Sequence, residues 1–185
     1  MGSIKSGGDS VFEIAYLEGF ERVMTADPEH FLKLKSLSGA AASDWHPVKV
    51  SLEVHDRGRN LEHALLPWLS SSLLVLRDEA IETVGPLLQP FGELLALDCR
   101  EAKLMLFNPL SLIDALDEES SIIVRFRSGR ILDIERTVLR KELLTSAGAF
   151  KLASHPGGKV YFTESLVNAI RATGHSSGIE FRIPA

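Results

Sequence analysis

The stretch Lys103–Asp133, KLMLFNPLSLIDALDEESSIIVRFRSGRILD, decides the fold that the sequence predicts. It begins with an apolar run at 104–107 that has the composition of a β-strand. Asn108-Pro109 ends this run, because proline has no amide hydrogen to donate to a β-ladder. We therefore expect a strand that stops at the asparagine.

After this strand the sequence predicts a short helix and then an acidic corner. Ser111 is placed to cap the helix, and its apolar side chains Leu112, Ile113 and Leu116 would share one helical face. The acidic corner is the run of three carboxylates at 117–119. Such a run usually forms a solvated corner whose first carboxylate caps backbone amides. The alternatives are a metal site or an acid–base pair, with Asp114 as a further carboxylate, or a patch that faces a partner.

The stretch closes with a predicted β-hairpin. Two apolar-rich runs, Ile122–Phe126 and Ile131–Ile134, flank Ser128-Gly129, and glycine supplies the positive φ that tight hairpin turns require. In the first run, Val124 and Phe126 alternate with arginines. This period of two predicts one buried and one solvated face, with the apolar side chains on the buried face.

Outward from this stretch, further strands and two helices are expected. The predicted strands are 11–16, 48–54, 73–76, 94–97, 150–152, 160–162 and 179–183. Asp78 and Thr163 are expected to open helices, and Pro86 is expected to kink the first of them or to end it early near Gly85. His30–Leu34 is expected to form a strand or turn, with Asp27-Pro28 as a breaker.

These elements predict an α+β fold with mixed or mainly antiparallel sheets and a few short helices. Residues 1–10 are expected to form a flexible tail, and residues 11–185 a single domain. An N-terminal lobe, 11–72, packed on a C-terminal lobe, 73–185, is the alternative arrangement within that domain. A homodimer is also compatible with the sequence.

The composition and net charge of the chain limit the classes of function that it can have. The chain has 185 residues and a formal net charge of −5, and neither half is basic, which argues against a nucleic-acid-binding face. No apolar run reaches the length of a membrane span, and the start lacks the features of a signal peptide. The single cysteine, Cys99, excludes an internal disulfide. These features predict a cytoplasmic protein.

The sequence contains no specific catalytic or metal-binding motif. None of the six histidines has the HxH or HExxH spacing that brings two imidazoles to one metal. His55 with Asp56 and His63 is the nearest approach to a cluster. Gly157-Gly158-Lys159 precedes a predicted strand rather than a helix, which indicates a hairpin turn and not a phosphate loop. We therefore assign no catalytic, cofactor-binding or metal-binding residue.

Three other residues could each be either a packed structural residue or a functional one. Cys99 lies next to Arg100, which could lower the pKa of its thiol, but its place at the end of an apolar strand favours a small packed residue. Trp45, which is soon followed by the strand at 48–54, is expected in the core, and an interface anchor is the alternative. Trp68, beside a run of three serines, is expected to be partly exposed and is a candidate interface anchor.

From Trp45 onward, an ordered series of motifs covers about three quarters of the chain. In order they are Trp45 with Pro47-Val48, Leu76–Leu97, Phe107-Asn108, Ile113–Asp117 with Ser120, Phe150-Lys151-Leu152, Val160–Glu164 and Gly178–Phe181. In this succession the chain resembles immunity protein family 11, from bacterial polymorphic-toxin systems. It departs from the family pattern at Lys151, where an arginine is usual, and at Pro109 after the asparagine.

The resemblance implies a non-enzymatic protein that protects its producer by binding and occluding a cognate protein toxin, without a cofactor. Asp117, Glu118, Glu119 and Trp68 are the residues we expect at the partner interface. The rival hypothesis is a small-molecule-binding or hydrolytic domain whose site is assembled from distant residues, with His55, Asp56 and His63 as candidates. A deep pocket of converging polar groups would favour the rival.

Overall fold

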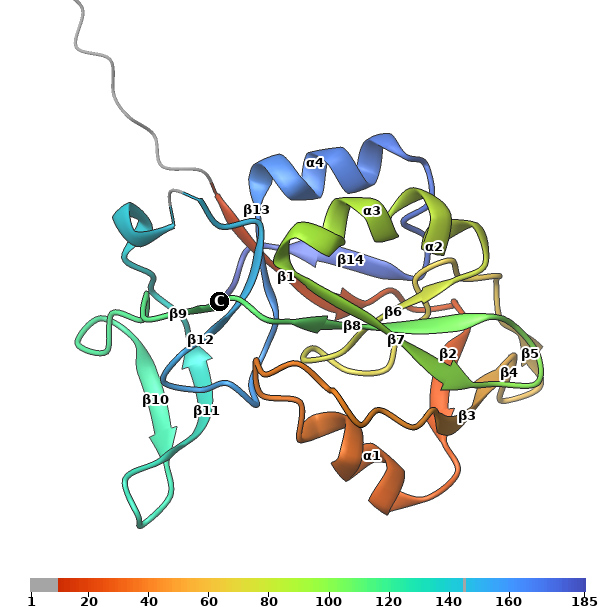
Figure 1. Cartoon of the computed structure of the whole chain (residues 1–185), viewed down its shortest axis with the longest axis horizontal. Coiled ribbons are helices and arrows are strands. Elements are labelled where there is room, and N and C mark those ends of the chain that lie inside the picture. The colour runs from red at the N-terminus through yellow and green to blue at the C-terminus, as the bar shows by residue number, and fades with distance from the viewer. Residues whose placement is uncertain (1–9, 145) are drawn as a thin grey trace, which may run out of the picture.

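The computed structural model describes residues 10–144 and 146–185. Strands make up 38% of the chain and helices 18%, in mixed and antiparallel sheets, so the predicted α+β fold is confirmed. Figure 1 shows the two main sheets, with a separate two-stranded hairpin at one end.

The first five-stranded sheet joins the two ends of the domain. Its strands, in spatial order, are β14 (Ile179–Arg182), β1 (Val11–Tyr16), β13 (Tyr161–Thr163), β12 (Ala149–Leu152) and β9 (Leu112–Ile113). β1 lies antiparallel between β13 and β14, whereas β9 pairs with β12 in parallel. The first strand of the chain is therefore held between two of the last.

The second five-stranded sheet is formed by the middle of the chain. Its strands, in spatial order, are β2 (Arg22–Thr25), β3 (Val48–Glu53), β7 (Gly92–Asp98), β8 (Leu104–Pro109) and β6 (Leu74–Arg77). β3 and β7 pair in parallel, and the other neighbours are antiparallel. Both sheets therefore combine strands that precede residue 72 with strands that follow it.

Two hairpins stand outside these sheets. β4 (His55–Asp56) and β5 (Arg59–Asn60) are joined by Arg57 and Gly58, which have φ values of 48° and 78°. β10 (Ile122–Arg125) pairs with β11 (Ile131–Arg136), and Gly129 in their turn has a φ of 84°. The hairpin predicted around Ser128-Gly129 is thus confirmed, with the glycine in the left-handed region.

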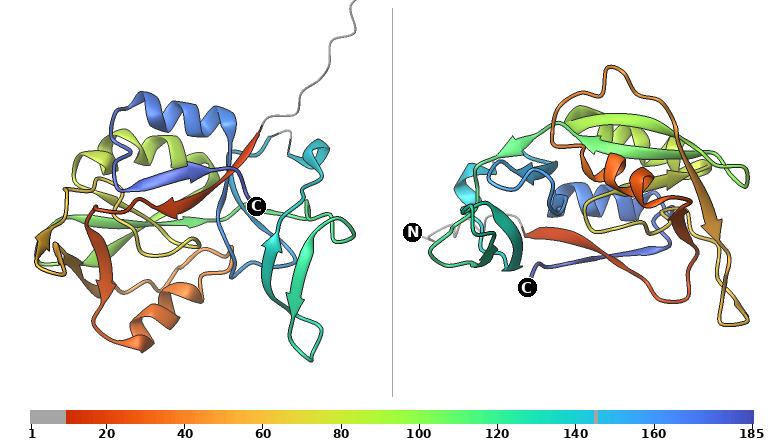
Figure 2. Two further views of the ribbon diagram at one scale, coloured as in Figure 1. Left: turned by 180° about the vertical axis from the view of Figure 1, so that it is seen from behind. Right: turned by 90° about the horizontal axis from the view of Figure 1, so that it is seen from below.

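The helices are short and lie on two sides of the molecule. They are α1 (Pro28–Lys35), α2 (Glu79–Thr83), α3 (Gly85–Leu88) and α4 (Glu164–Ala172), with 3₁₀ turns η1 (Gln89–Phe91) and η2 (Lys141–Leu143). α2, α3 and α4 lie together on one side, and α1 lies on the other (Figures 1 and 2). The break between α2 and α3 falls next to Pro86, as predicted.

Three clusters of buried side chains form the core. The first places Val167 and Ile170 of α4 against Ile14 of the first sheet and Phe107 of the second. The second lies under α1 and includes its one fully buried residue, Leu34. The third cluster lies under the β10–β11 hairpin. Apolar burial therefore joins the two sheets and also anchors the hairpin.

The predicted helix after Ser111 is wrong. Leu112 and Ile113 form strand β9, opposite Lys151 and Leu152 of β12. The amide of Lys151 donates to the carbonyl of Ser111 over 3.0 Å. A single helical turn gains little in isolation, whereas the open edge of β12 supplies backbone partners.

The prediction of a strand or turn at His30–Leu34 is also wrong, because this segment lies within helix α1. Asp27 is its N-cap, and its carboxylate accepts a hydrogen bond of 2.8 Å from the amide of Glu29. Pro28 occupies the first turn, where its missing amide hydrogen costs nothing. The Asp-Pro pair therefore starts a helix instead of preventing one.

Two predictions about individual side chains are also corrected. Phe126 is 47% exposed instead of buried, because irregularities in the register between β10 and β11 interrupt the alternation of faces. Trp45 is only partly buried and packs against the second core cluster. Its indole nitrogen donates to the carbonyl of Ala96 over 2.8 Å, so its polar edge is satisfied.

Candidate binding surface

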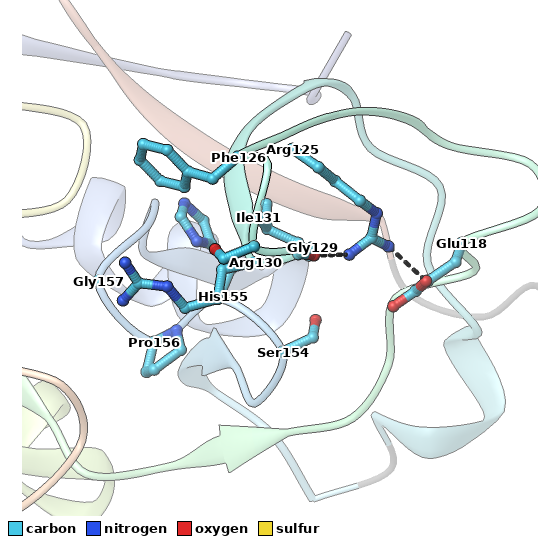
Figure 3. Close-up of a pocket in the computed structure, with 11 residues that line it drawn as sticks. Glu118, Arg125, Phe126, Gly129, Arg130, Ile131, Ser154, His155, Pro156 and Gly157 are labelled. Carbon is cyan, nitrogen blue, oxygen red and sulfur yellow. Dashed lines mark hydrogen bonds and ion pairs between the residues drawn. The ribbon is translucent and has the colours of Figure 1, made fainter.

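A large concave surface lies between the β10–β11 hairpin and the turn at 154–157 (Figure 3). We call it the groove, and its volume is about 690 Å³. It is lined by Glu118, Arg125, Phe126, Ser128, Gly129, Arg130, Ile131, Ser154, His155, Pro156 and Gly157. Most of these residues come from the stretch Lys103–Asp133 that the sequence singled out.

One wall of the groove is the hairpin, which acts as a fixed arm. Among the described residues, β10 and β11 pair only with each other. The inner face of the arm is held by Ile131 and Ile134, which are buried in the third core cluster, and by the partly buried Ile123. The arm is therefore anchored by apolar packing, while its tip remains accessible.

The exposed surface of the arm, part of which faces the groove, combines apolar side chains with arginines. Ile122, Phe126 and Leu132 are 46%, 47% and 48% exposed. The guanidinium of Arg130 lies over the Phe126 ring, 5.6 Å from its centroid. Arg125 and Arg127 are also exposed at the tip. Aromatic and arginine side chains with accessible apolar area are the residue types that dominate the energetics of protein interfaces.

The acidic corner predicted from the sequence borders this groove, but most of it is engaged within the protein. Glu118 forms an ion pair of 2.6 Å with Arg125. Asp117 accepts a hydrogen bond of 3.2 Å from the amide of Ser120, and hydrogen bonding to Ser120 lowers the pKa of this carboxyl. Glu119 is exposed. Only Glu118 of the three lines the groove.

Trp68, the fourth predicted interface residue, lies elsewhere. It is partly buried and packs against the first core cluster. Its ring is tilted against that of Tyr16, with centroids 6.4 Å apart, and its carbonyl accepts a hydrogen bond of 2.8 Å from the amide of Val23. The structure therefore does not bring Trp68 together with the acidic corner.

A smaller pocket of about 110 Å³ adjoins the groove and shares His155 with it. It lies between β11 and the turn after His155, and its lining includes Lys35, Asp133, Lys159 and Tyr161. We call it the cationic pocket. No sequence pattern predicts this pocket, because its lining comes from α1, β11 and the segment before and within β13, which are far apart along the chain.

Lys151 lies close to this pocket and is one of the largest fully buried side chains, with 1% exposure. Burial, and then the charge of Lys35, lowers the pKa of Lys151 to about 8. Burial and the same lysine also lower the pKa of His155. The sequence held one signal of this site, a lysine between the buried Phe150 and Leu152.

The other residues considered from the sequence, His55, Asp56, His63 and Cys99, do not come together in one site. His55 and His63 are exposed, and Asp56 lies 3.8 Å from Arg22. The thiol of Cys99 donates to Glu101 over 3.1 Å, and partial burial followed by this contact raises the pKa of the thiol. In the ranges 10–144 and 146–185, no three His, Cys, Asp or Glu side chains are grouped to hold a metal.

In comparisons with known proteins, no family model matches the chain and no curated protein matches it. Within the described ranges, no helix has both the length and the apolar character needed to cross a membrane. Three features of the surface are candidates for binding, namely the arginine-rich arm, the groove beside it and the cationic pocket.

Proposed function

We propose that this chain is an immunity protein, which binds a cognate bacterial protein toxin in the cytoplasm and occludes it. The observation that carries the proposal is the free-standing arm with its exposed Phe126, Ile122 and Leu132 among arginines. The resemblance to immunity protein family 11, on the motifs from Trp45 to Phe181, supports the same reading. The chain would act by binding and not by catalysis.

The arm and the groove together provide the apolar area and the charged hydrogen-bond donors that a tight protein interface needs. The exposed apolar side chains supply area that can be removed from water, worth about 25 cal/mol per Å². Arg127 and Arg130 supply planar donors suited to carboxylates, whereas Arg125 is paired with Glu118. A stable complex buries roughly 1,200–2,000 Å² in total, so the interface would extend beyond the arm. The neighbouring acidic corner is then part of its rim.

The first experiment is co-expression of the full chain with the product of the adjacent gene, followed by pull-down and a growth assay. A stable complex together with restored growth is the expected result. Absence of both a complex and protection overturns the assignment for that partner. This outcome would move the search to the ligand-binding alternative.

The role of the arm is tested by truncating Phe126 to alanine in the same complex. Loss of this anchor is expected to weaken binding at least about tenfold, as is usual for an aromatic hot spot. Met24→Ala is the matched control, because Met24 on strand β2 has the same exposed fraction, 47%, and lies outside the groove. Equal affinities for the two variants would remove the arm from the interface.

A further inference from the structure

The cationic pocket gathers more positive than negative charge. Lys35 and Lys159 line it, and Lys151 is close enough to both Lys35 and His155 for their charges to interact. The ammonium of Lys151 donates one hydrogen bond, of 3.1 Å, to the carbonyl of Leu37. The Lys35 ammonium donates to the hydroxyl of Ser72 over 3.1 Å.

The carboxylates nearby do not balance these cations. Glu13, which is 1% exposed, pairs with Lys159 at 2.7 Å and also with Arg182 at 3.0 Å, so one buried carboxylate serves two cations. Within the described residues, neither Lys35 nor Lys151 has a carboxylate within 4.0 Å. Two ammonium groups therefore share a partly dry environment in which their repulsion is poorly screened.

Asp133 is the one further acidic group on the lining, and it is exposed. One oxygen of its carboxylate accepts a hydrogen bond of 2.9 Å from the amide of Ile134. It supplies a negative charge on the lining, opposite in sign to the charges of the lysines. An anion that enters would therefore gain from Lys35 and Lys159 and be opposed by Asp133.

We propose that the cationic pocket is a binding site for a small oxyanion, a phosphate or carboxylate group, held by Lys35 and Lys159 with Lys151 as supporting charge. A cavity of about 110 Å³ has space for a group of a few heavy atoms. Each ammonium can still donate further hydrogen bonds, because it carries three donors. Burial, and then the charge of Lys35, lowers the pKa values of Lys151 and His155, and a bound anion would offset the contribution from Lys35.

This proposal does not rest on the proposed toxin binding. The cationic pocket adjoins the partner surface, since His155 lines both the pocket and the groove and Leu132 of the arm also lines the pocket, but its charged residues Lys35 and Lys159 do not line the groove. If the toxin experiment fails, the proposed oxyanion site is not refuted. If no anion binds, the proposed toxin binding is not refuted either. The two proposals are therefore tested separately on the same full chain.

The experiment is a titration of the full chain with inorganic phosphate at pH 7 and constant ionic strength, followed by thermal shift and calorimetry. Sodium acetate in a parallel arm distinguishes a phosphate site from a carboxylate site. Saturable stabilisation by either anion is expected, with sodium chloride as the ionic control. Lys35→Met should weaken binding at least tenfold, whereas Lys49→Met, a change at an exposed lysine on β3, should leave it unchanged.

Asp133→Asn should have the opposite effect to Lys35→Met, since removal of the repelling negative charge should tighten binding of the same anion severalfold.

A second measurement uses the wild-type protein and therefore does not depend on variants. The pKa of Lys151, followed by NMR of its side chain in the wild-type protein, should rise from about 8 when phosphate is added. No saturable effect of either anion, or equal losses in the Lys35 and Lys49 variants, overturns the proposal.

Discussion

The carboxylate of Glu118 lies 2.6 Å from the guanidinium of Arg125 and joins the acidic corner to the end of strand β10, next to the turn of the hairpin arm. Arg125 also donates to the carbonyl of Gly129 across the hairpin turn, over 2.9 Å. One side chain thus connects the corner, the first strand of the arm and its tip. The corner and the arm form one continuous surface and not two separate features.

This connection predicts that Glu118→Gln loosens the tip of the arm more than it destabilises the protein. Both side chains are about half exposed, so the ion pair contributes only about 0–1 kcal/mol to the free energy of unfolding. Hydrogen exchange at residues 125–130 should become faster, while the melting temperature changes little. Glu119→Gln is the control, and equal exchange in both variants would contradict a role for the ion pair.

Glu119 offers a clean test of electrostatic attraction toward a basic partner. It is exposed, and its replacement leaves the Glu118–Arg125 pair intact. Glu119→Lys should slow association severalfold and reduce its dependence on salt, with little change in dissociation. Stopped-flow measurement with the captured partner checks this. An unchanged association rate at low salt would exclude the corner from steering.

Lys151 predicts an unusual stability profile in alkaline solution. Its folded pKa, about 8, lies below the ordinary value of 10.5, so the unfolded chain binds more protons between these limits. Stability should therefore rise as the pH increases from 8 to 10.5, by about 3 kcal/mol relative to a variant without this group.

Urea unfolding across this pH range measures the effect, with Lys151→Met as the reference. The wild type should gain on the variant as the pH rises, and the difference should be constant below pH 7. Parallel profiles for the two proteins would show that Lys151 titrates normally. In that case its burial would carry no electrostatic cost.

Asn108 is predicted to hold the loop before β3 against the second sheet. It is fully buried, and its amide nitrogen donates to the carboxylate of Glu93 over 2.8 Å and to the carbonyl of Ala40 over 3.0 Å. The same Glu93 oxygen accepts the amide of Ala42 over 2.7 Å. Asn108→Ala should lower the free energy of unfolding by about 2–3 kcal/mol, because a charged acceptor loses its donor.

Chemical denaturation provides the measurement, and Asn60→Ala in the exposed β5 provides the control. Exposed substitutions of this kind usually change stability by less than about 0.5 kcal/mol. A similar small effect at Asn108 would mean that solvent replaces its hydrogen bonds. The loop at 36–43 would then be held by other contacts.

Elements with strong local patterns could be predicted from the sequence. The alternation in 48–54 matches β3, and the apolar face of Leu166, Val167 and Ile170 matches helix α4. The turn at Gly129 matches the β10–β11 hairpin. Each depends on the side-chain period or on backbone chemistry within a few residues, which is information that a short segment contains.

Segments with weak local patterns were predicted wrongly. Leu112 and Ile113 can lie on a helix or in a strand, and the free edge of β12 decides between them. The Asp27-Pro28 pair both stops and starts helices, and the packing of Leu34 in the second core cluster favours the helix that follows. Short apolar segments take the structure that their neighbours in space complete.

The sequence by itself determined the α+β class, most strands and the position of the hairpin, because side-chain periodicity and turn chemistry act over a few residues. Only the tertiary structure decided that β1 lies between β13 and β14, that Phe126 is exposed and that Lys151 is buried near Lys35. The groove and the cationic pocket are likewise features that only the tertiary structure reveals. Burial and charge environment arise from segments far apart in the chain, so they exist only once those segments pack.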